Sequence, residues 1–183
     1  MSSLDARTCS SRRWTSGREH GRVESILIHP AEDRDIASVE AINIAAFAGV
    51  HESIAELLGG ELNALVYPDW ETTQHQELLE STADESSSLW VAEQESVVVG
   101  FVVIDVDPLT RVGELSLIAV HPDHQGRGIG TELNRFALDR MRRAGMTLAT
   151  VATGGDASHA AARRSYEKAG FVALPLVRYY VAL

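Results

Sequence analysis

The stretch from Gln125 to Gly130 constrains this chain more than any other segment. A β-branched strand ending at Val120 precedes it, and an amphipathic helix follows it. Its glycines remove the Cβ atoms that would block a close approach of the backbone, and free N–H groups at a helix start favour a pyrophosphate. Arg127 would add positive charge. The pattern predicts an anion-binding loop, although alternating glycines also suit a plain tight turn into a helix.

The glycine spacing excludes two common phosphate loops. No Lys-Ser or Lys-Thr pair follows the glycines, as a P-loop requires. Gly126, Gly128 and Gly130 alternate and lie late in the chain, so they do not match the G-x-G-x-x-G loop that opens a first βαβ unit. The anion would therefore be bound in a different fold.

Two motifs resemble those of the GNAT acetyltransferases. Gln125-x-x-Gly128-x-Gly130 is similar to the family's Q/R-x-x-G-x-G/A loop, whose amides bind the pyrophosphate of coenzyme A. The segment HAAARRSYEKAGF is similar to the family's N-x-x-A-x-x-x-Y-x-x-x-G-F helix. The resemblance covers residues 114–171 and implies acetyl-CoA as co-substrate. It implies these cofactor-binding residues: Ile118, Ala119, Val120, Gln125, Gly126, Arg127, Gly128, Ile129, Gly130, Thr131, His159, Ala162 and Tyr166.

The resemblance also implies the fold class. We expect an α/β (mixed α+β) domain over residues 25–183, with a mostly antiparallel, twisted sheet of about seven strands flanked by helices. The sheet would splay between its fourth and fifth strands. Periodicity places the strands at 25–29, 89–93, 97–105, 113–121, 146–152, 171–174 and 176–182. Residues 1–24 are rich in Ser, Arg and Gly, which predicts a disordered tail.

Tyr166 and Glu114 are the candidate catalytic residues. A phenol can protonate the departing thiolate, and similarity to the family puts Tyr166 at the thioester sulfur. The alternative for Tyr166 is packing on an amphipathic helix. Glu114 resembles the strand carboxylate that acts as base in some members, but it would equally be an ordinary edge residue. A backbone N–H near Val120 is the expected donor to the thioester carbonyl.

One position departs from the family pattern. His159 stands where the family has Asn, so the hydrogen bonds of that Asn near the pantetheine arm are in question. A histidine can donate in its place, or it can face solvent in the first helical turn.

Composition narrows the partners. The net charge of −10 disfavours nucleic acid and suits a small cationic amine as acceptor. With Cys9 as the only cysteine there is no internal disulfide or cysteine-based metal site, and His121 and His124 flank Pro122 without further ligands, so we expect no metal. No stretch approaches about 18 continuous apolar residues, and no apolar region follows Arg12-Arg13. We expect a cytoplasmic protein that does not bind membranes.

The function implied by the resemblance is therefore acetyl transfer from acetyl-CoA to a primary amine. Two alternatives remain open. One is a non-catalytic module that binds acyl-CoA as a sensor or partner-binding protein, and the other is an acetyltransferase for protein N-termini or lysines. Strands at the C-terminus could pair between subunits, so a homodimer is possible.

Overall fold

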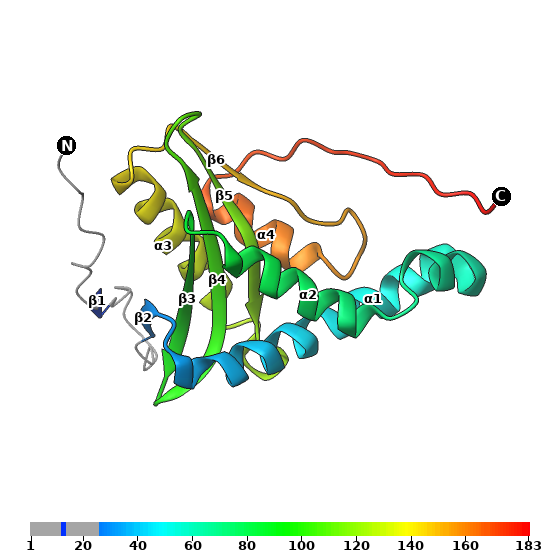
Figure 1. The fold of residues 1–183 in the computed structure, drawn as a ribbon, viewed down its shortest axis with the longest axis horizontal. Coiled ribbons are helices and arrows are strands. Elements are labelled where there is room, and N and C mark those ends of the chain that lie inside the picture. The colour runs from blue at the N-terminus through cyan, green and yellow to red at the C-terminus, as the bar shows by residue number, and fades with distance from the viewer. Residues whose placement is uncertain (1–11, 14–25) are drawn as a thin grey trace.

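Residues 12–13 and 26–183 are described in the computed structural model (Figure 1). The predicted disordered tail, residues 1–24, lies outside these residues apart from Arg12–Arg13. Those two residues form β1, which pairs antiparallel with β2 (Leu27–Pro30).

One sheet runs through the domain in the order β1-β2-β3-β4-β5-β6. Its longer strands are β3 (Ser87–Gln94), β4 (Val97–Asp107) and β5 (Val112–Val120), and β6 spans Leu148–Val151. All neighbours are antiparallel except β5 and β6, which are parallel. The mixed, mostly antiparallel sheet is confirmed. The expected number of about seven strands is wrong, because the sheet has six strands, or five without the two-residue β1.

The two missing strands are those predicted at 171–174 and 176–182. Residues 171–183 form no helix or strand and run away from the sheet in an extended path (Figure 1). From Val172 onward their apolar side chains are exposed, whereas Phe171 packs against the core. The prediction was wrong because alternating β-formers make a strand only beside an edge that completes their hydrogen bonds.

Helices cover both faces of the sheet (Figure 1). A 3-10 turn, Asp33–Asp35, leads into α1 (Ile36–Val66), and α2 (Trp70–Ala83) packs beside it. On the other face, α3 (Ile129–Arg143) follows a 3-10 turn at Pro122–His124 and packs against α4 (Ala160–Ala169). The predicted helical flanks are therefore confirmed.

The core has two halves because β4 is buried on both faces. Val102 and Ile104 point to the side of α3, where they meet Leu133 and Met141. Phe101 and Val103 point to the side of α1 and α2, where they meet other buried side chains: Val39, Ile42 and Leu78. This two-sided burial explains why β4 reads as a continuous apolar run rather than an alternating one.

The long helical stretch Asp33–Val66 has two features of its own. Gly59 has φ 74° and ψ 165°, so α1 is kinked at this residue. By length and composition alone the stretch could cross a membrane, a test that core helices and signal sequences also pass. In this structure Val39 and Ile42 pack it onto the sheet. The expectation of no membrane contact stays a prediction.

The predicted splay between the fourth and fifth strands is confirmed. These strands, expected at 113–121 and 146–152, are β5 and β6 of the structure. The two strands pair only from Val112 opposite Leu148 to Leu115 opposite Val151. β5 continues to Val120 without β6 beside it, which opens the sheet at the end that carries the glycine-rich loop.

Candidate active site

A cavity of about 460 Å³ opens where β5 and β6 diverge. Its floor is β5, and its walls are the glycine-rich loop, the segment from β6 into α4, and side chains of α1 and α2. The structure brings most of the predicted site residues onto this wall. They are Ile118, Ala119, Val120, Gln125, Gly126, Gly128, Ile129, Gly130, Thr131, His159, Ala162 and Tyr166.

Two predicted residues do not lie on the cavity wall. Arg127 turns back along its own loop, where Nη2 donates to the carbonyl of Asp123 at 3.0 Å. Glu114 is exposed and lies opposite Thr150 in the paired part of the sheet, before β5 and β6 diverge. The structure therefore gives no support to Glu114 as a base.

The loop before α3 is held in a shape that few residues other than glycine adopt. Gly126 and Gly128 have φ of 75° and 89°, in the left-handed region. The Gln125 side chain donates to the carbonyl of Val120 at 3.0 Å, which fixes the loop to the end of β5. No side chain caps α3 at Gly128, so the amides of the first turn are left for a ligand.

Two buried polar atoms on the cavity wall support a polar ligand. Ser116 Oγ on β5 and His124 Nδ1 beside the loop have no hydrogen-bond partner in the described part of the chain. Buried polar groups are costly without a partner. With the free amides of the first turn of α3, they fit a long ligand that carries both an anion and amide groups.

Tyr166 lies on the cavity wall with its ring buried against Phe171, at 6.0 Å between ring centroids. Burial raises the pKa of its phenol to about 12. The phenol is therefore protonated at neutral pH and available as a proton donor. Ser165 fixes α4 to α3, since its hydroxyl accepts a hydrogen bond from Asn134 Nδ2 at 3.0 Å.

The face of the cavity opposite the loop comes from α1 and α2. Phe47 and Val50 supply apolar surface, and Glu77 is the only acidic side chain on the wall among the described residues. Partial burial, and then the nearby Glu80, raises the pKa of Glu77. Asn43 and Gln74 fix α2 to α1, because Asn43 Nδ2 donates to the Gln74 carbonyl and Gln74 Nε2 to Asn43 Oδ1, at 3.0 and 3.1 Å.

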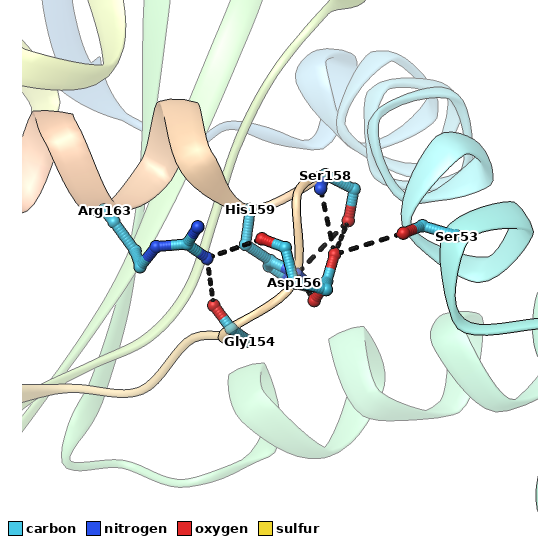
Figure 2. A network of polar contacts seen from close by, with 6 residues as sticks. All are labelled: Ser53, Gly154, Asp156, Ser158, His159 and Arg163. Carbon is cyan, nitrogen blue, oxygen red and sulfur yellow. Dashed lines mark hydrogen bonds and ion pairs between the residues drawn. The ribbon is translucent and has the colours of Figure 1, made fainter. Parts of the chain in front are cut away.

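A compact polar network joins the loop between β6 and α4 to α1 (Figure 2). His159 Nδ1 lies 2.6 Å from Asp156 Oδ2, and Asp156 Oδ1 accepts from the backbone N–H of Ser158 at 2.9 Å. Ser53 Oγ of α1 donates to the same carboxylate at 3.3 Å. Arg163 Nη1 donates to the carbonyls of Gly154 and Asp156, at 2.6 and 2.7 Å.

Sequence reasoning missed several residues of the wall and of the polar network beside it. Glu77 was part of a helix without a recognised role, and Asp156 and Ser158 were part of a loop. Arg164 and Lys168 also line the cavity and add positive charge from α4. The Asp-x-Ser-His spacing at 156–159 was the signal available for the network, because Asp side chains bond backbone amides two residues on. Among the residues that the structure describes, no group of three His, Cys, Asp or Glu could hold a metal ion.

Comparisons with known proteins identify the family of this chain. The sequence model of the acetyltransferase (GNAT) family matches residues 52–171. A mycothiol acetyltransferase of Sanguibacter keddieii is 32% identical over 147 residues, 78% of this chain and 41% of that protein. One from Streptomyces coelicolor is 28% identical over 76% of this chain and 40% of that protein. The chain thus spans about 40% of the length of these relatives.

Solved structures share the fold at low identity. A GNAT family acetyltransferase from Brucella melitensis, in complex with acetyl-CoA, has a TM-score of 0.56 and 21% identity, over 82% of this chain and 84% of that one. The ribosomal-protein-S18-alanine N-acetyltransferase of Escherichia coli has a TM-score of 0.55 and 22% identity, over 79% and 76%.

Proposed function

The chain belongs to the GNAT acetyltransferase family, and we propose that it transfers the acetyl group of acetyl-CoA to the primary amine of a small, cationic acceptor. The observation that carries the proposal is a single cavity in which an anion-binding loop and the phenol of Tyr166 line the same wall.

Acetyl-CoA fits the groups that this wall offers. The pyrophosphate would bind the amides of the first turn of α3, whose dipole favours an anion. The pantetheine arm carries amide groups, which would occupy the open edge of β5 beyond Leu115 and the unpaired Ser116 hydroxyl. A free N–H of β5 near Val120 would donate to the thioester carbonyl as charge develops on its oxygen.

Tyr166 would act as the general acid. Its pKa of about 12 keeps the proton on the phenol at neutral pH. The departing thiolate of coenzyme A is a weaker base than the phenolate of Tyr166, so its protonation requires that the phenol regain a proton from the newly acetylated, still protonated amine. Transfer of the phenolic proton to the sulfur then makes the thiol a stable leaving group.

The acceptor would enter from the side of α1 and α2. Glu77 is the acidic side chain of that wall, so it would attract an ammonium group, while Phe47 and Val50 would contact the carbon skeleton. The mycothiol acetyltransferase relatives favour a small molecule over a protein substrate. An acceptor that is a protein N-terminus or lysine remains the alternative.

The test is thiol release from acetyl-CoA with a panel of amines: spermidine, an aminoglycoside, lysine and a peptide with a free N-terminus. The proposal expects acetylation of at least one small amine, and a large loss of the rate in Tyr166→Phe with acetyl-CoA affinity unchanged. Acetyl-CoA binding without thiol release for any amine would instead favour the sensor alternative. Preference for the peptide would favour the protein acetyltransferase alternative.

A further inference from the structure

His159 and Asp156 form a pair that the family motif does not contain. Their side chains are largely buried, with 16% and 11% of the respective side-chain surface exposed. Burial alone would raise the pKa of Asp156, but the hydrogen bonds from Ser158 and His159 outweigh it and hold this pKa well below its ordinary value. Asp156 is therefore ionised wherever an enzyme of this kind works.

An ionised carboxylate fixes the tautomer of its partner. It can only accept, so the proton of a neutral His159 ring lies on Nδ1, 2.6 Å from Asp156 Oδ2. The lone pair is then on Nε2. That leaves a basic ring nitrogen on a residue of the cavity wall.

The local backbone is shaped around this pair. A Cβ on Gly154 would overlap both Asp156 Oδ2 and His159 Nδ1, so no larger residue fits there without moving them. Arg163 holds the same loop in place, because its guanidinium donates to the backbone carbonyls of Gly154 and Asp156 (Figure 2). Glycine is needed at this position for space, since its φ is not in the left-handed region.

The pair also lies where the two substrates would meet. Asp156 accepts from Ser53 of α1, the helix that supplies Phe47 and Val50 to the acceptor side. His159 itself starts α4, the helix that carries Tyr166 on the cofactor side.

The other titratable groups of the wall suit a base less well. Glu77 on α2 is largely exposed, and His124 lies beside the glycine-rich loop. Glu114 is outside the cavity. Arg164 and Lys168 are cations, and Tyr166 is protonated. Among the residues that the structure describes, only His159 combines a place on the wall with a carboxylate that orients its ring.

Resting on the proposed acetyl transfer, we propose that His159 is the general base that deprotonates the acceptor ammonium, and that Asp156 is its positioning residue. The ammonium proton passes to His159 Nε2, directly or through one water. The neutral amine then attacks the thioester carbon, so that a C–N bond forms and the C–S bond breaks. The thiolate takes a proton from Tyr166, which regains one from the amide nitrogen, and His159 returns its proton to solvent.

The test compares His159→Asn with wild type. Asn is the family's residue at this position, and it keeps a hydrogen-bonding amide without a base. We expect acetyl-CoA affinity within about 3-fold of wild type, and a rate with the best amine of the panel that falls by about 100- to 10,000-fold. Hydroxylamine, which is neutral at pH 7, needs no base, so its acetylation should fall far less. His75→Asn, at an exposed histidine of α2, is the matched control.

Asp156→Asn should show the same separation of rate from cofactor affinity. Should that variant fold poorly, nitrogen NMR of the wild-type histidine rings reports the tautomer directly, and Nδ1–H on His159 is expected. Equal losses for hydroxylamine and the alkyl amine, or Nε2–H on His159, would overturn the inference while leaving the acetyltransferase intact. Failure of the wild type to acetylate any amine would instead overturn the proposed function, and this inference with it.

Discussion

Replacement of Gly128 by Ala tests whether the left-handed loop is built for a ligand. Gly128 has φ 89°, and a Cβ there would meet nothing within 4 Å. The cost of the substitution is therefore conformational, about 1–2 kcal/mol for a side chain in the left-handed region. The exposed loop can relax in the free protein, and binding of pyrophosphate must then restore the strained backbone. That penalty predicts acetyl-CoA binding weaker by about 5- to 30-fold.

Gly145 provides a matched control, because it has the same kind of backbone in a different place. Its φ is 83°, its Cβ would also be unobstructed, and it follows the end of α3, away from the cavity. Gly145→Ala should lower the free energy of unfolding by about 1–2 kcal/mol and leave acetyl-CoA affinity unchanged. Calorimetric titration and urea unfolding of both variants measure the two effects. Equal affinity in wild type and Gly128→Ala would refute the reasoning.

Three further predictions follow from the wall and the core. Glu77→Gln should raise the KM for a cationic amine by about 10-fold without changing the Kd of acetyl-CoA; an unchanged KM would remove Glu77 from the acceptor site. In alkaline titration followed by ultraviolet absorbance, Tyr166→Phe should lose a step near pH 12. Because burial raises the folded-state pKa of Tyr166, the stability contributed by its protonated phenol is fully present below about pH 10. It is lost as the pH rises through 12. Asn43→Ala removes both hydrogen bonds between Asn43 and Gln74 and leaves the buried side-chain amide nitrogen of Gln74 without this partner, so it should cost about 1–3 kcal/mol in urea unfolding; a loss below about 0.5 kcal/mol would contradict this expectation.

Local patterns were enough to predict the elements that position the cofactor side. The alternation in 113–121, the glycines at 126–130 and the helical spacing after them are all short-range signals, and β5, the loop and α3 follow them. The splay was predicted from the family resemblance, and the pairing of β5 with β6 confirms it.

The remaining parts depend on contacts between distant segments. Glu77 reaches the wall only because Asn43 and Gln74 fix α2 against α1, 31 residues apart in sequence. The orientation of His159 depends on Asp156, Ser53 and the space left by Gly154, none of which periodicity reveals.

A crystal structure with acetyl-CoA tests the central claim most directly. We expect the pyrophosphate on the amides that follow Gly128, the pantetheine arm along the open edge of β5, and the sulfur within hydrogen-bonding distance of the Tyr166 hydroxyl. Coenzyme bound elsewhere on the domain, or a thioester remote from Tyr166, would contradict it.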